Sequence, residues 1–217
     1  MELFFTRHGK TEWNLEKRLQ GKTGDSALLP ESLQEIERLG TYLKHFNIER
    51  IYTSPSLRAR RTAEIINHKR TDECPIILSE GLREWGLGDL EGILIEKAKS
   101  EFPAEMRYFR EDLSKFDPTP FHGETVTQVL DRMSRTVHTA MLESKGNILF
   151  VSHGAALTAT INYLIGSPLS QLRSRGGLNN NTLSILSASK PELPFELIKW
   201  NDDHFLKQHG QSTKDII

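Results

Sequence analysis

Short apolar runs alternate with amphipathic stretches along most of this chain, and that alternation limits the folds it can adopt. An apolar run of a few residues is typical of a buried strand, whereas apolar residues spaced three or four apart are typical of a helix covering a sheet. The alternation predicts a three-layer α/β fold with a mostly parallel central sheet, helices on both faces and right-handed connections. We expect strands at 3–5, 48–53, 76–78, 148–151, 183–186 and 195–200, and helices at 30–46, 57–66, 126–141 and 154–164.

The length of 217 residues predicts a single domain spanning 1–217, because no Pro-, Gly- or Ser-rich linker divides the chain. Residues 93–122 interrupt the strand–helix pattern and are interpreted as an inserted lid over a site. Within them, residues 102–121 hold five aromatic residues and three prolines. The alternative is that these aromatic side chains only pin a long connection onto the core, and both interpretations stay open. From Phe205 onward the chain is polar, and we expect it to be frayed.

Charge and composition exclude several classes of protein. The 28 basic and 29 acidic residues leave a net charge of −1, which excludes a nucleic-acid binder that neutralises many phosphates. Apolar residues make up 37% of the chain, too many for a disordered one. No apolar segment approaches the ~20 residues of a membrane helix, residues 1–7 do not resemble a secretory signal, and the lone Cys74 cannot form an intrachain disulfide. We therefore expect a cytoplasmic protein without nucleic-acid or membrane partners.

Three strand-to-helix junctions place basic residues at the carboxyl ends of predicted strands. In an open α/β sheet these ends line the ligand crevice, and helix N-termini there offer N–H groups to anions. Two arginines and two histidines at one edge, helped by the helix dipoles, predict a site for a tetrahedral dianion. A glycine after each histidine lets the backbone approach that anion closely. The residues at these junctions are Arg7, His8, Gly9, Arg58, His153 and Gly154.

The three junctions lie within three of six short sequence blocks, which together spread over nearly the whole chain. The blocks are residues 6–14 (TRHGKTEWN), 19–28 (LQG and DSAL), 54–64 (SPSLRA and TAE), 82–92 (LREW, Gly88 and EG), 123–125 (GET) and 151–154 (VSHG). In this order they resemble the signature of the histidine phosphatase superfamily, the phosphoglycerate-mutase-like proteins. One block alone would be a weak signal, but six in order are specific.

The resemblance implies a role for each residue of the site. His8 would be the nucleophile that becomes a phosphohistidine, while Arg7, Arg58 and His153 would neutralise the phosphoryl oxygens. Glu84 would protonate the leaving group and then accept a proton from water. Because the arginines replace a cation, we expect no metal and no cofactor. Hydrogen bonds to the phosphoryl group or the nearby substrate would come from Asn14, Gln20 and the backbone at Gly21, Gly154 and Ala155.

The resemblance also bears on whether the phosphoryl group passes to water or back to substrate. The cofactor-dependent mutases of the family carry a Tyr and then a Lys after the acidic residue, whereas residues 85–92 here read WGLGDLEG. We therefore favour a metal-independent phosphomonoesterase acting on a small phosphorylated metabolite, as a monomer or homodimer. Arg107 and Arg110 could partly substitute for the missing cations, so phosphoglycerate mutase-type transfer is the alternative. A non-catalytic phosphate-binding module is disfavoured because nucleophile and acid are both present.

Overall fold

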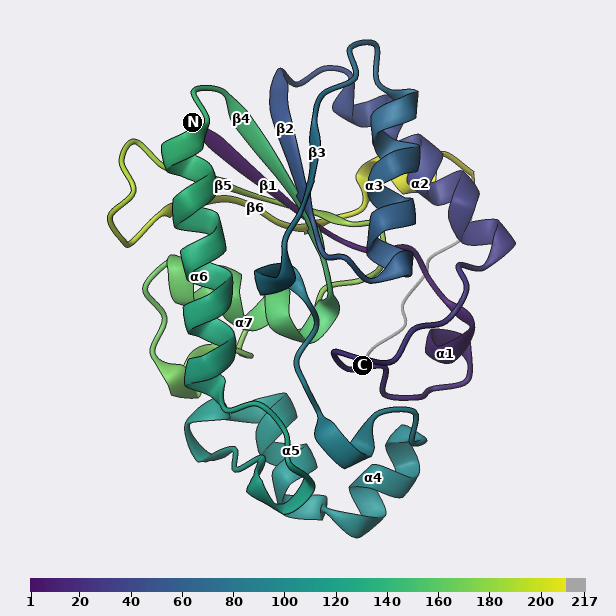
Figure 1. The fold of residues 1–217 in the computed structure, drawn as a ribbon, viewed down its shortest axis with the longest axis vertical. Helices are drawn as coiled ribbons and strands as arrows, with labels where there is room; N and C mark the ends of the chain where they lie inside the picture. Colours follow the sequence, from purple (N-terminus) through teal and green to yellow (C-terminus); the bar gives the residue numbers. More distant parts are fainter. Residues whose placement is uncertain (210–217) are drawn as a thin grey trace.

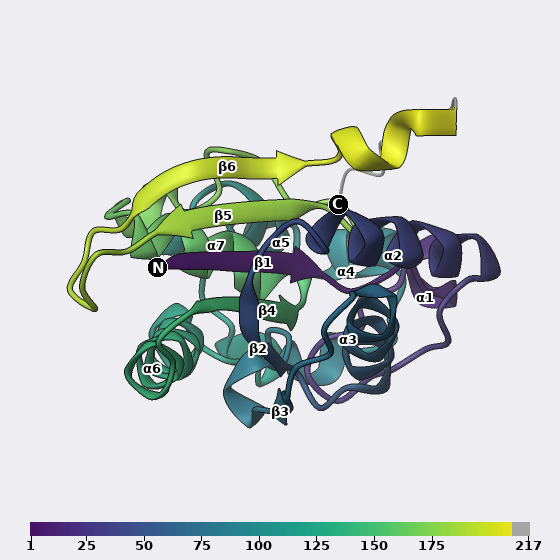
Figure 2. The same cartoon turned by 90° about the horizontal axis from the view of Figure 1, so that it is seen from above.

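The computed structural model describes residues 1–209, and these residues build one six-stranded sheet (Figures 1 and 2). Its order is β3-β2-β4-β1-β5-β6. The strands β1 to β4 are parallel, whereas β5 runs antiparallel to both β1 and β6. The predicted mostly parallel sheet is thereby confirmed, with β5 reversed. The strands are β1 (Glu2–Arg7), β2 (Ile48–Thr53), β3 (Ile76–Leu78), β4 (Asn147–Ser152), β5 (Leu183–Ser187) and β6 (Glu196–Asp202).

Helices cover both faces of the sheet, as the alternation predicts. The pair α2 and α3 lies on one face and the pair α6 and α7 on the other (Figures 1 and 2). Successive residues of β1 point to opposite faces, so Phe4 packs in the core under α2 and α3, whereas Leu3 and Phe5 pack in the other core. The helices are α1 (Glu12–Leu15), α2 (Pro30–Leu43), α3 (Leu57–Lys69), α4 (Ile95–Glu101), α5 (Pro103–Glu111), α6 (Val126–Glu143) and α7 (Gly154–Leu164).

Residues 93–122 form α4, α5 and two 3₁₀ turns beyond the carboxyl edge of the sheet (Figure 1). Their aromatic side chains gather on the buried Trp85, whose ring centroid lies 5.1 Å from that of Phe109 and 5.8 Å from that of Phe116. Phe121 is also buried in this core. The segment is thus anchored by its aromatic residues, and it also forms part of the pocket described below.

The expectation of a frayed chain from Phe205 onward is wrong for the first part of that stretch. A 3₁₀ helix spans His204–His209, and Phe205 and Leu206 are buried in the core that α2 and α3 cover. The Phe205 ring stacks on Tyr42 of α2 at 4.7 Å between centroids, so burial of these two side chains holds the segment. Residues 210–217 lie outside the described part of the chain. Within the described part, every helix is too short or too polar to cross a bilayer.

Candidate active site

The first and third basic junctions meet because β1 and β4 are adjacent parallel strands. His8 follows β1 and His153 follows β4, and the His8 backbone N–H donates to the Ser152 carbonyl at 2.9 Å. The centroids of the two imidazole rings are 5.1 Å apart, with an interplanar angle of 64°. Both histidines are buried, His8 at 3% exposure and His153 at 0%. Residues 145 positions apart in the chain therefore share one site.

The His8 ring is held in a single tautomer. Its Nδ1 lies 2.7 Å from the carbonyl oxygen of Gly9, and a carbonyl can only accept, so the proton is on Nδ1. The Nε2 atom keeps its lone pair and accepts from Arg58 Nε at 3.3 Å. Burial, followed by the charges of Arg58 and Arg7, lowers the pKa of His8 well below its ordinary value. A neutral ring with an available nitrogen is the form that attacks phosphorus.

His153 is neutral for similar reasons. Burial is the largest cause that lowers its pKa well below the ordinary value, and Arg58, His8 and Arg7 add to it. Its Nε2 shares a hydrogen bond with Ser54 Oγ at 2.8 Å. Its Nδ1 is buried without a hydrogen-bond partner among the described residues. Among the described residues, this is the one ring nitrogen of the two histidines without a hydrogen-bond partner.

Arg58 reaches the histidines from the start of α3 and is held by the loop of residues 21–25. Its Nη1 donates to the Gly24 carbonyl at 2.6 Å and to Asp25 Oδ1 at 3.0 Å, and its Nη2 donates to the Gly21 carbonyl at 3.1 Å. The Arg58 side chain is fully buried. Gly21 has φ +63°, and a Cβ there would collide with the Glu91 carboxylate, so glycine is required.

The Glu91 carboxylate explains why this loop keeps its shape. It accepts the backbone N–H groups of Lys22, Thr23 and Leu87, at 2.8, 2.9 and 3.0 Å. Although burial acts in the opposite direction, hydrogen bonds from Thr23 and Lys22 lower the pKa of Glu91. Glu91 lies in the stretch that departs from the mutase pattern, and here it binds the protein's own backbone.

Arg7 is the last residue of β1. Its Nη1 donates to the Leu178 carbonyl at 2.9 Å. At Gly154 a Cβ would lie 3.1 Å from Arg7 Nε and 3.2 Å from its Cζ, so a larger first residue of α7 would require the guanidinium to shift by a few tenths of an ångström. The glycine after His153 thus makes room for an arginine side chain.

Glu84 caps the N-terminus of α7. Its Oε1 accepts from the backbone N–H of Ala156 at 2.8 Å and of Trp85 at 2.8 Å, and its Oε2 accepts from the Ala155 N–H at 3.1 Å. The carboxylate thereby binds two of the helix's free N–H groups and faces its positive end. The Ala155 N–H therefore donates to Glu84 in this structure, and its expected contact with the phosphoryl group or substrate stays a prediction.

Two other residues expected to contact the phosphoryl group are engaged with Thr11. Asn14 Oδ1 accepts from the Thr11 backbone N–H at 3.1 Å, completing a capping box at α1. Gln20 Nε2 donates to Thr11 Oγ1 at 2.8 Å, and Gln20 Oε1 accepts from Ser26 Oγ at 3.2 Å. Both residues line the pocket, and these side-chain hydrogen bonds fix them to Thr11 and Ser26.

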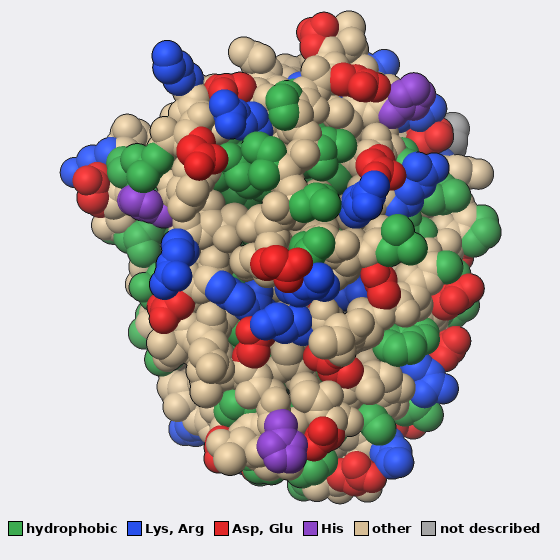
Figure 3. Space-filling model, in the orientation of Figure 1, with side chains coloured by type: hydrophobic (Ala, Val, Ile, Leu, Met, Phe, Trp, Pro, Cys, Tyr) green, Lys and Arg blue, Asp and Glu red, His purple; other side chains and the backbone are tan. Residues whose placement is uncertain are grey.

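Nine of the ten predicted site residues line one pocket of about 840 Å³, whereas the fully buried His153 is not among its lining residues. The pocket also takes Met106, Phe109 and Arg110 from α5, whereas Arg107 of the same helix does not line it. Lys and Arg side chains, mixed with Asp and Glu, gather across the middle of the face in Figure 3, above the position of α4 and α5. The site residues in the lining are Arg7, His8, Asn14, Gln20, Gly21, Arg58, Glu84, Gly154 and Ala155.

Arg173 lines the same pocket, and the sequence contains no signal that identifies it. Its Nη1 donates to the Ala155 carbonyl at 3.1 Å and its Nε to the Phe109 carbonyl at 3.0 Å. The guanidinium lies 5.0 Å from the Phe109 ring centroid and 5.7 Å from that of Trp85. Burial lowers the pKa of Arg173 to about 10, with Glu84 acting in the opposite direction. This residue therefore joins α5 to the start of α7.

The buried histidines make stability depend on pH. Their folded-state pKa values are lowered, so the unfolded chain binds protons that the folded chain does not. As the pH falls below ~6.5, we expect the free energy of unfolding to decrease by up to about 1.4 kcal/mol per pH unit for each histidine. Urea unfolding of the free protein between pH 8 and pH 5 measures this slope. The His153→Asn variant should show a shallower slope, and His138→Asn, at an exposed histidine, should leave it unchanged.

Within the described residues, no three His, Cys, Asp or Glu side chains are grouped to hold a metal ion.

Comparison with known proteins is consistent with this geometry. A family model described as histidine phosphatase superfamily (branch 1) matches residues 3–203. PhoE of Bacillus subtilis, described as an uncharacterized phosphatase, is 34% identical over 163 residues, 74% of this chain and 75% of its own. GpmB of Escherichia coli, described as a probable phosphoglycerate mutase, is 32% identical over 170 residues, 77% of this chain and 76% of its own.

Solved structures match over almost the full length. YhfR of Bacillus stearothermophilus superposes with a TM-score of 0.84 at 32% identity, covering 93% of this chain and 96% of its own. A mycobacterial glucosyl-3-phosphoglycerate phosphatase complexed with VO3 superposes with a TM-score of 0.81, covering 93% of this chain and 98% of its own. At 24% identity, the latter shows the shared fold alone.

Proposed function

The chain belongs to the histidine phosphatase superfamily, and we propose that it is a phosphomonoesterase that hydrolyses a small phosphorylated metabolite through a phosphohistidine on His8. The observation that carries this proposal is the state of the His8 ring. Its proton is fixed on Nδ1 by Gly9, its Nε2 faces Arg58, and its pKa is held low. Such a ring is a nucleophile ready at neutral pH.

The first chemical step forms a bond between His8 Nε2 and phosphorus and breaks the bond to the ester oxygen. Charge on the phosphoryl oxygens is met by Arg7 and Arg58, which the backbone holds in place before substrate arrives. The buried Nδ1 of His153 adds a hydrogen-bond donor when Ser54 donates to Nε2. Fixed donors in a buried site stabilise the transition state without reorganising, which is the main source of acceleration in phosphoryl transfer.

We assign the proton transfers to Glu84, which lines the same pocket. It gives a proton to the leaving oxygen as the P–O bond breaks, and its carboxylate then accepts a proton from the water that attacks the phosphohistidine. The products are an alcohol and inorganic phosphate. The N–H groups of Ala155, Ala156 and Trp85 hold the carboxylate in place between the two steps.

Hydrolysis is favoured over transfer by the residues that follow Glu84. Residues 85–92 contain no Lys or Arg that could bind a second anionic group, and their two carboxylates are engaged elsewhere: Glu91 binds the backbone of the loop at residues 22–24, and Asp89 pairs with His122 at the surface. Phosphoglycerate mutase-type transfer is the second candidate because GpmB, at 32% identity, carries that description.

The test is a panel of phosphomonoesters, assayed with EDTA for both inorganic phosphate and isomer formation. We expect phosphate release, with EDTA having no effect because the proposed mechanism places arginines where a metal would act. Isomer exchange without phosphate release would establish a mutase instead. Failure to turn over any ester, while inorganic phosphate still binds, would support a binding module. The cytoplasmic location, the single domain and the monomer or homodimer state stay predictions.

A further inference from the structure

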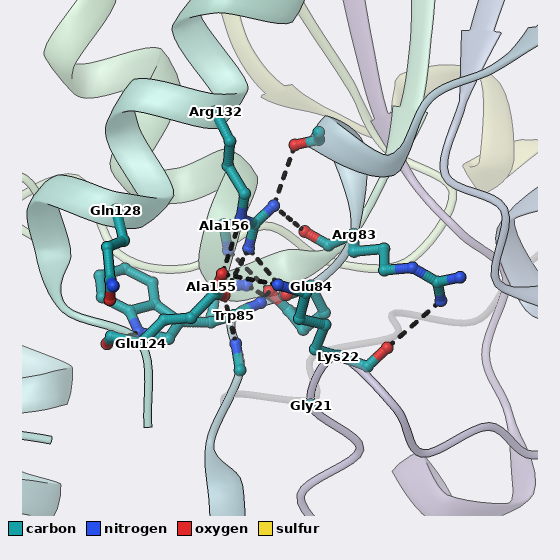
Figure 4. A network of polar contacts seen from close by, with 12 residues as sticks. Gly21, Lys22, Arg83, Glu84, Trp85, Glu124, Gln128, Arg132, Ala155 and Ala156 are labelled. Carbon is teal, nitrogen blue, oxygen red and sulfur yellow. Dashed lines mark hydrogen bonds and ion pairs between the residues drawn. The ribbon is translucent and has the colours of Figure 1, made fainter. Parts of the chain in front are cut away.

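Arg132, in the middle of α6, makes five side-chain hydrogen bonds next to the proposed acid (Figure 4). Its Nη1 donates to the carbonyls of Gly81 at 2.9 Å and Arg83 at 2.6 Å. Its Nη2 donates to the Glu84 carbonyl at 2.9 Å and to Glu124 Oε2 at 2.8 Å, and its Nε donates to Glu124 Oε1 at 3.1 Å. A guanidinium has five N–H donors, so each of them has an acceptor here.

Glu124 holds the backbone on the other side of Glu84. Its Oε2 accepts from the Gly86 N–H at 2.8 Å, and its own carbonyl accepts from Trp85 Nε1 at 2.8 Å. Although burial acts to raise it, hydrogen bonds from Arg132 and Lys22 lower the pKa of Glu124, which keeps the pair charged. Arg132 and Glu124 together therefore fix the chain on both sides of residue 84.

The same pair is connected to the loop that holds Arg58. Lys22 Nζ donates to Glu124 Oε1 at 2.9 Å, and Arg83 Nη1 donates to the Lys22 carbonyl at 3.4 Å. Lys22 follows Gly21, whose carbonyl accepts from Arg58. One half-buried network thus runs from α6, through the backbone of Glu84, to the loop of the phosphate site (Figure 4).

We propose that Arg132, acting with Glu124, is a positioning residue that sets the place of the Glu84 carboxylate relative to the phosphoryl group on His8. This inference rests on the proposed phosphatase activity. Arg132 does not line the pocket, so it acts through the Glu84 backbone and not on substrate. Proton transfer is sensitive to displacements well below 1 Å, and a planar fork that binds three carbonyls and a carboxylate prevents them.

The readout is the dependence of kcat/KM on the leaving group. A simple alkyl phosphate needs its leaving oxygen protonated, whereas the 4-nitrophenolate released from 4-nitrophenyl phosphate is stable as an anion and departs without a proton donor. The Arg132→Lys variant keeps the charge but cannot reach all five acceptors. We expect kcat/KM to fall about 100-fold for the alkyl ester and less than about 5-fold for the nitrophenyl ester. Glu84→Gln should show the same asymmetry, because both variants impair the same proton transfer.

Two further variants make the test decisive. Arg135→Lys alters an exposed arginine on the same helix and should leave both rates unchanged. Glu124→Gln keeps the shape of the network and removes one charge, so it should give a weaker version of the asymmetry and decides the matter if Arg132→Lys does not fold. Equal losses for the two esters, or no loss, would reduce the network to a structural role and overturn the inference. Absence of turnover of either ester by the unaltered protein would instead refute the proposed function.

Discussion

Replacing His8 by asparagine is expected to lower kcat by about 10⁵-fold, the largest effect of any single substitution in this chain. Asparagine keeps a polar side chain in the site but has no ring nitrogen to attack phosphorus. The Nε2 atom that Arg58 contacts is the atom lost. Rates on a phosphomonoester, together with labelling from a ³²P-ester after an alkaline quench, measure both consequences. Labelled protein is expected for the unaltered chain and not for His8→Asn.

Two comparisons separate chemistry from folding in this experiment. His138→Asn, at an exposed histidine of α6, should leave rate and labelling unchanged. Binding of inorganic phosphate to His8→Asn should stay within about 10-fold of the unaltered protein, because Arg7 and Arg58 remain. If His8→Asn still became labelled, another residue would be the nucleophile, and His153 would be the first to examine.

Arg58→Gln should produce the second largest loss, about 10³-fold in kcat/KM, because it removes a fixed charge from the transition state. It should also lower the free energy of unfolding by about 2 kcal/mol, since the carbonyls of Gly21 and Gly24 lose their donor. Steady-state kinetics and urea unfolding measure the two effects separately.

The control lies on the same helix. Arg61 has a side chain that is 60% exposed and pairs only with Glu64 at the surface among the described residues. Arg61→Gln should therefore change the rate less than about twofold and the stability by less than about 1 kcal/mol. A kcat/KM for Arg58→Gln within tenfold of the unaltered protein would mean that Arg58 supports the loop and not the reaction.

The parts of the fold that could be predicted are those that depend on side-chain periodicity. Successive residues of a strand point to opposite faces, which explains why Leu3 and Phe5 pack in one core and Phe4 in the other. The helix of residues 30–43 follows from apolar residues spaced three or four apart. The direction of β5 could not be predicted this way, because an antiparallel strand has the same apolar pattern as a parallel one. The anchoring of Phe205 was missed because two apolar residues among polar neighbours make no pattern.

The site divides along a similar line. Residues 7, 8 and 153 lie at or directly after strand ends, and Arg58 lies in the first turn of α3 after β2. Adjacent parallel strands bring these ends together, so the meeting of the four residues could be predicted. The network around Arg132 could not, because three of the five hydrogen bonds of this side chain go to backbone carbonyls, which every residue carries. The same holds for Ala155, whose N–H is taken by Glu84. Sequence patterns report side chains, whereas these contacts depend on where the main chain runs.

The reversal of β5 has a consequence for how the pocket can change. Because this strand starts at the edge where the parallel strands finish, the chain that enters it passes the pocket and places Arg173 and Leu178 there. The loops after β1, β2 and β4, which carry the proposed phosphate-binding residues, lead away from this edge of the sheet. Of the two described strands that pair with β1, only β5 is entered from this edge. Side-chain substitutions in this stretch, for example at Ser174, would therefore change the pocket wall while the Leu178 carbonyl keeps its hydrogen bond to Arg7.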